Sequence, residues 1–165
     1  MKKLLLATAI TLSMTTVASA IPTYQLSAQA VSANDFAKAL KKGKLPGSKG
    51  HVGMSYKQLK KVAPNAKKWS PGDPFGGVIV GKDNYGYKTN KASARAQIIG
   101  RHYQSGNVIS KSSLEKKIGK PYKTYYNASY YKKGKYALLV IWPYSNNDDV
   151  HFTVGTPETV NYIPL

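Results

Sequence analysis

The sequence predicts an α+β fold, in which two tandem repeats of a helix and an antiparallel sheet form one domain. Three observations lead to this prediction. Short helical patterns with a Ser or Asn cap are followed by segments rich in Tyr, Val and Ile, which favour strands. Two of these patterns echo each other, since Ser55 and Leu59 match Ser110 and Leu114. Residues 34–165 are long enough to bury a core as one domain.

The first predicted repeat covers about residues 34–105 and begins with a helix over 34–42. Asn34 can cap the free amides of the first turn, and Phe36 and Leu40 lie four residues apart on one face. The pattern of apolar residues and turn residues predicts the elements that follow. These are a helix over 55–62, which Pro64 ends, and strands over 77–80, 85–87 and 95–103.

The second predicted repeat covers about residues 106–156 and begins with a helix over 110–118. Ser110 can cap this helix, and Gly119 and Pro121 are residues that commonly stop one. The remaining sequence alternates between apolar runs and turn residues. The expected elements are strands over 122–126, 129–131, 136–142 and 150–154, and an extended tail over 155–165.

The N-terminus has the order of charged, apolar and small residues that is typical of a secretory signal peptide. Lys2 and Lys3 precede an apolar run that extends to Val17. The run is too short and too rich in Thr and Ser for a membrane span, which needs about 20 apolar residues. We therefore expect residues 1–33 to be a signal peptide and leader, and the protein to be secreted, extracellular or loosely associated with the cell wall. The cleavage site stays open among Ala20, Ala30 and Ala33.

The composition is strongly basic and lacks cysteine. Lys and Arg number 25 against 7 for Asp and Glu, a formal charge of +18 that becomes +16 without Lys2 and Lys3. Such a charge attracts polyanions and keeps copies of the protein apart, so we expect a monomer. Only Arg95 and Arg101 carry the guanidinium fork that favours phosphate and base recognition, which argues against a nucleic-acid partner. The absence of cysteine excludes disulfides, a thiol nucleophile and attachment of a lipid to cysteine.

The sequence contains no recognisable catalytic, metal-binding or cofactor-binding motif. The seven carboxylates fall mostly in predicted turns, caps and exposed helix positions, and Asp148 and Asp149 would point to opposite faces of a strand. The three histidines lack the spacing of a zinc site. His102 beside Arg101 is a pair that a basic nuclease could use. We therefore predict no catalytic residue, no metal and no cofactor.

Tyrosines gather beside lysines after the helix predicted over 110–118. Tyrosine offers a rigid apolar ring with a polar tip, which suits a binding surface. The alternative is that half of these rings fill the core and the others are ordinary strand residues. The candidate ligand-binding residues are Tyr122, Tyr125, Tyr126, Tyr130, Tyr131, Lys123, Lys132 and Lys133.

Several short motifs resemble one known group of proteins. Leu114-x-x-x-Ile118-Gly119-Lys120-Pro121, followed by Tyr-rich strands and Lys133-Gly134-Lys135-Tyr136, resembles the YjgB-like family of secreted Firmicutes proteins of unknown function. The resemblance implies tandem repeats of the β-lactamase-inhibitor-protein type, protein binding on a concave sheet and no catalytic residues. The chain departs from the family at Ala63-Pro64-Asn65, where Gly-x-Pro is typical, and in its strongly basic charge.

Together these features favour a secreted, non-enzymatic binding module that holds an unknown protein through a Tyr/Lys-rich sheet face. A first alternative is a basic protein retained on anionic polymers of the wall or membrane surface. If the lysines serve only to keep the protein soluble, that alternative loses its basis. A wall-directed hydrolase or nuclease is the least favoured alternative, because no acid/base pair is apparent in the sequence.

Overall fold

Short helices precede, separate and follow two groups of strands in the computed structural model, which describes residues 31–67, 69–104, 108–144 and 149–163. These residues form four helices and one seven-stranded sheet in which all neighbouring strands are antiparallel, so the predicted α+β fold class is confirmed. In chain order the elements are α1 (Ala33–Lys41), α2 (Tyr56–Val62), β1 (Gly76–Val80), β2 (Asp83–Tyr87), β3 (Ile98–Gln104), α3 (Lys111–Ile118), β4 (Lys123–Tyr125), β5 (Ala128–Lys133), β6 (Tyr136–Ile141), β7 (Asp149–Gly155) and α4 (Pro157–Asn161).

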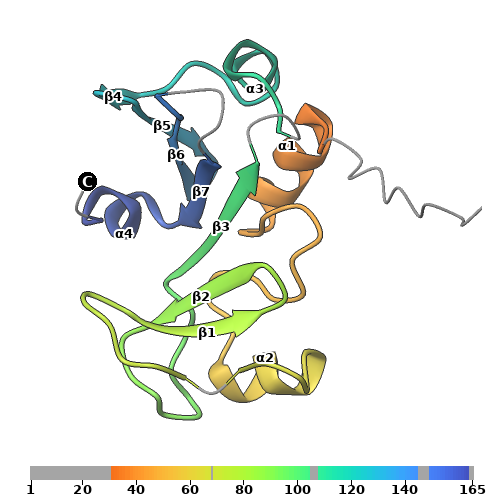
Figure 1. Cartoon of the computed structure of the whole chain (residues 1–165), viewed down its shortest axis with the longest axis vertical. Coiled ribbons are helices and arrows are strands. Elements are labelled where there is room, and N and C mark those ends of the chain that lie inside the picture. The colour runs from red at the N-terminus through yellow and green to blue at the C-terminus, as the bar shows by residue number, and fades with distance from the viewer. Residues whose placement is uncertain (1–30, 68, 105–107, 145–148, 164–165) are drawn as a thin grey trace, which may run out of the picture.

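The last strand of the chain lies at the centre of the sheet. The strand order is β1-β2-β3-β7-β6-β5-β4, so β7 lies between β3 and β6 (Figure 1). β7 pairs with β3 along its whole length, from Asp149 opposite Gln104 to Gly155 opposite Ile98. A three-stranded meander therefore flanks β7 on each side, β1–β3 on one and β4–β6 on the other. A Ser-capped helix precedes each meander in the chain, α2 in the first case and α3 in the second.

Serine caps fix the first turns of these two helices. The side chain of Ser55 accepts a hydrogen bond from the backbone N–H of Gln58, and the Gln58 side chain accepts one from the Ser55 backbone, which completes a capping box. At α3 the side chain of Ser110 accepts from the backbone N–H of Ser113. Both predicted caps are confirmed.

Two predictions about the ends of the domain are wrong. The cap of α1 is Ser32, whose side chain accepts from the N–H of Asp35, whereas the sequence pattern pointed to Asn34. The tail after β7 is not extended, because α4 begins at once. Thr156 caps α4 and a proline occupies its first position, which is a combination that favours the start of a helix.

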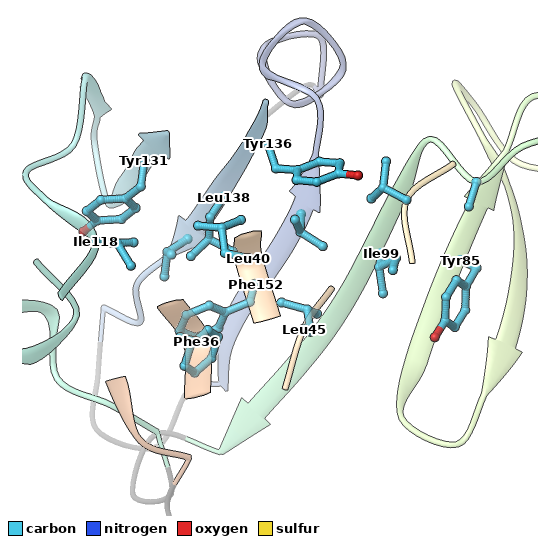
Figure 2. Packing of buried hydrophobic residues seen from close by; sticks show 14 of the residues in the cluster. Phe36, Leu40, Leu45, Tyr85, Ile99, Ile118, Tyr131, Tyr136, Leu138 and Phe152 are labelled. Atoms are coloured by element: carbon cyan, nitrogen blue, oxygen red, sulfur yellow. The ribbon is translucent and has the colours of Figure 1, made fainter. Parts of the chain in front are cut away.

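The main core lies on the face of the sheet that α1, α2 and α3 cover. Phe36 of α1 stacks on Phe152 of β7, with ring centroids 4.6 Å apart, and Leu59 and Leu114 bring α2 and α3 into the same cluster (Figure 2 shows part of it). Successive side chains of a strand point to opposite faces, so each strand also presents residues to the other side. There α4 covers β6 and β7, and its Val160 belongs to a second, smaller apolar cluster.

Candidate functional site

The structure separates the eight predicted ligand-binding residues into exposed and buried groups. Tyr122, Tyr125 and Tyr126 are 46%, 51% and 81% exposed. Lys123 and Lys132 are also exposed, and Lys133 is half-buried at the end of β5. We call the five exposed residues the Tyr/Lys surface: Tyr122, Lys123, Tyr125, Tyr126 and Lys132.

Tyr130 and Tyr131 correct the prediction, because both are core residues. They are adjacent on β5 and so point to opposite faces of the sheet, where each is covered. Tyr131 enters the main core, its hydroxyl donates to Glu115 Oε1 at 3.4 Å, and burial raises its pKa to about 12. Tyr130 belongs to the second cluster, and the Lys123 ammonium lies 4.8 Å from its ring centroid. Neither ring is free to contact a partner.

The Tyr/Lys surface lies on an edge of the sheet. β4 is the end strand of the seven and pairs with β5. Tyr126, which follows β4, has a φ of 49°, a left-handed conformation that is uncommon for a bulky residue. Its ring lies edge-on to that of Tyr125, with centroids 4.4 Å apart. Tyr122 is held in place by its hydroxyl, which donates to Asn161 Oδ1 of α4 at 3.0 Å.

The opposite edge of the sheet is closed by the chain itself. The backbone N–H of Lys67 donates to the carbonyl of Ile79 on β1, and Ser70 and Gly77 exchange backbone hydrogen bonds. The segment before β1 thus covers the edge that an unpaired strand would expose. Among the described residues, β4 is therefore the edge strand without such a cover.

The predicted nuclease pair does not meet in the structure. Arg101 points to the core side of β3, where its guanidinium pairs with the Asp83 carboxylate at 2.7 Å. His102 points to the other face and stacks on His151 of β7, with ring centroids 4.1 Å apart and an angle of 11° between the rings. Arg101 and His102 therefore cannot act together on one reacting group.

Two further structural properties bear on the predictions. In the described part of the chain, no group of three or more His, Cys, Asp or Glu side chains is placed to hold a metal ion. No helix in the described ranges is both long and apolar enough to cross a membrane. The segment predicted as signal peptide lies outside these ranges, except for residues 31–33.

Comparison with solved structures finds the crystal structure of a DUF4309 family protein (YjgB) from Bacillus subtilis subsp. subtilis str. 168 at 2.13 Å resolution. The TM-score is 0.55 and the sequence identity is 16%, and the match covers 79% of this chain and 99% of that chain. The fold is YjgB-like. The resemblance that the motifs indicate is thereby supported at the level of the fold, and an identity of 16% carries no function with it. No family profile matches the chain, and no curated protein matches it either.

Proposed function

We propose that the protein is an exported, non-enzymatic binding module that holds an acidic protein through the Tyr/Lys surface. The observation that carries the proposal is the exposure of Tyr122, Tyr125 and Tyr126 together on the uncovered edge of the sheet. Exposed tyrosines are common anchors of protein interfaces, because a rigid ring buries much area at a low entropic cost. Lys123 and Lys132 beside them favour a partner of negative charge.

The free edge of β4 can add backbone hydrogen bonds to such a contact. An uncovered strand presents unpaired N–H and C=O groups, and a partner's extended segment can pair with them. β4 has three residues, so this pairing is short. We therefore assign most of the binding energy to the tyrosine rings. The edge of β4 would mainly orient the partner.

We also propose that the two halves of the sheet are tandem repeats. In each half a helix with an extended Ser cap is followed by a three-stranded meander, and the cap φ/ψ angles are −72°/153° at Ser55 and −67°/151° at Ser110. In this reading β1 and β4 are equivalent first strands of the two meanders. The first copy closes its edge with Lys67 and Ser70, whereas the second copy leaves its edge free for a partner.

The proposal of export rests on the N-terminal sequence. The cap of α1 reduces the number of expected cleavage sites from three to two. Cleavage after Ala33 would remove Ser32 and with it the cap of α1. Cleavage after Ala20 or Ala30 leaves the cap in place, as well as Val31, which packs against the main core. We therefore place the mature N-terminus at or before Val31.

Capture of partners from culture supernatant and envelope extract, at low and at moderate salt, tests the protein-binding proposal. The site variant carries Tyr125→Thr and Tyr126→Asn, since Thr suits a strand and Asn tolerates a positive φ. The matched control is Ile79→Ala, an exposed apolar position on the opposite edge strand, 41% exposed. We expect an acidic protein to be captured by the wild type and the control and lost by the site variant. Equal capture by all three, or no capture by any, would contradict the proposal.

Retention on anionic envelope polymers is a second candidate function, and the charge favours it. The mature chain carries about +16. Attraction between exposed charges weakens as salt rises. Protein bound to purified envelope should therefore elute in a salt gradient, and elution that does not depend on salt would exclude this function.

A further inference from the structure

A basic groove lies between α1 and the loop that follows it. Its volume is about 960 Å³, and four lysines line it: Lys38, Lys42, Lys44 and Lys49. Asp35 is the acidic residue in the lining. Its carboxylate accepts a 2.6 Å hydrogen bond from the Ser32 hydroxyl of the helix cap. The lining therefore has a formal excess of three positive charges.

Within the described ranges, none of the four lysines forms an ion pair within 4.0 Å. In the described part of the chain the ion pair within 4.0 Å is that of Arg101 and Asp83, and none of the groove lysines belongs to it. Like charges gathered in one concave site repel one another and raise the local concentration of anions. Their arrangement thus stabilises the folded protein less than it would stabilise a bound anion.

Polar contacts, one of them buried and the others partly buried, hold the loop side of the groove in place. The guanidinium of Arg101, fixed by Asp83, donates to the carbonyl of Pro46 at 2.7 Å and to the Ser48 hydroxyl at 3.4 Å. The backbone N–H of Gly50 donates to the buried Tyr85 hydroxyl at 2.8 Å. The wall that carries Lys44 and Lys49 is therefore preformed, which lowers the entropic cost of binding.

The side chains in the groove select among polyanions. The described residues of the lining include neither an aromatic ring on which a base could stack nor an arginine, and single-stranded nucleic acid is bound by both. Lysine binds phosphate as a point charge, without the fixed geometry of a guanidinium fork. Lys38 of α1 and Lys42, the residue that caps the end of α1, are four residues apart and lie about 6 Å apart at Cβ, so they can contact neighbouring charges of one flexible chain.

We propose that this groove binds a linear phosphodiester polymer without nucleobases, of the polyol phosphate class. The inference deepens the second candidate function, retention on anionic envelope polymers, and rests on it. It assigns that retention to one groove instead of to the total charge.

Binding of synthetic poly(glycerol phosphate) to the mature protein, at about 50 mM salt where phosphate contacts are strong, tests the groove. The groove variant carries Lys38→Gln, Lys42→Gln, Lys44→Gln and Lys49→Gln. The control variant, of equal charge, carries Lys57→Gln, Lys61→Gln, Lys88→Gln and Lys91→Gln, all at exposed positions. We expect the groove variant to lose about tenfold or more in affinity, from the loss of four ionic contacts, and the control to lose far less. Thermal unfolding verifies that both variants are folded.

The other outcomes separate the groove from the function on which it rests. An equal loss in the two variants would overturn the groove and leave retention by total charge in place. No binding by the wild type would overturn both. Two polymers of equal charge, oligothymidylate and polyglutamate, test the class of ligand. Binding of either one as tight as that of poly(glycerol phosphate) would overturn the assignment to a base-free phosphodiester.

Discussion

His151 is a residue whose charge the fold suppresses. It lies on β7 opposite His102 of β3, and the two rings stack in parallel on the face of the sheet away from the main core. Burial, with a smaller contribution from His102, lowers the pKa of His151 to about 4, from an ordinary value of 6.5. The ring is therefore neutral in the folded protein at neutral and mildly acidic pH, whereas the unfolded chain takes up a proton below about pH 6.5.

This difference predicts that the protein loses stability in mild acid. The contribution of His151 is fully present above about pH 6.5, is lost as the pH falls toward 4, and changes little below that. Its upper limit is about 3.5 kcal/mol, at about 1.4 kcal/mol for each unit of pKa. Urea unfolding at several pH values between 7.5 and 4 measures it. His151→Asn should remove this part of the pH dependence, and His51→Asn, at an exposed position, should retain it. A constant difference between wild type and His151→Asn across the range would contradict the assignment.

At the scale of elements, the turn that ends α1 depends on a glycine, and a ring from β6 packs against that glycine. Gly43 has a φ of 64°, and a Cβ built on it would lie 2.6 Å from the ring of Tyr136. Gly47, in the same loop, has a φ of 75° but no heavy atom within 4 Å of a built Cβ. The two glycines thus share the left-handed conformation, and only Gly43 is in close contact with the core.

This pair predicts two different costs for the same substitution. Gly47→Ala should lose about 1 kcal/mol of unfolding free energy, from the left-handed backbone alone. Gly43→Ala should lose about 2 to 4 kcal/mol, since displacement of the Tyr136 ring adds an overpacking cost. Urea unfolding of both variants measures the difference. Equal losses would show that Tyr136 moves aside freely and does not fix the turn.

The elements that the sequence predicts well are those whose signals are local. Ser55 and Ser110 cap α2 and α3 through amides three residues away, so their partners are visible in the sequence itself. α4 is harder to predict, because five residues form a stable helix only when they dock. Val160 docks α4 by packing into the second apolar cluster on the sheet. The local sequence does not show that this face of the sheet is apolar.

The candidate site shows the same limit. The alternation of β5 indicates that Tyr130 and Tyr131 point to opposite faces, but whether either face is open depends on long-range packing. α3 and the core enclose Tyr131, and the second cluster encloses Tyr130. The exposed rings Tyr122, Tyr125 and Tyr126 lie at the sheet edge, and the central position of β7, which sets that edge, follows from topology and not from any short motif.

At the scale of the whole molecule, positive charge is the main electrostatic feature. The chain has 25 Lys and Arg residues against 7 Asp and Glu. In the described residues the ion pair within 4.0 Å, Arg101–Asp83, is largely buried, with side chains 13% and 4% exposed. Salt screens exposed charges well and buried pairs poorly. Added salt should therefore weaken the repulsion among lysines more than it weakens this attraction.

This balance predicts that NaCl stabilises the protein. Raising the concentration from about 0.01 M to 0.1 M shortens the screening length from about 30 Å to about 10 Å, so repulsion between distant lysines fades first. A gain of about 1 kcal/mol would raise Tm by a few degrees for a chain of this size. Calorimetry of the mature protein measures the rise. The variant with Gln at the four groove lysines should show a smaller rise, because four fewer positive charges are left to screen. A Tm that falls with salt in the wild type would mean that attractive contacts, not repulsion, dominate the field of the folded protein.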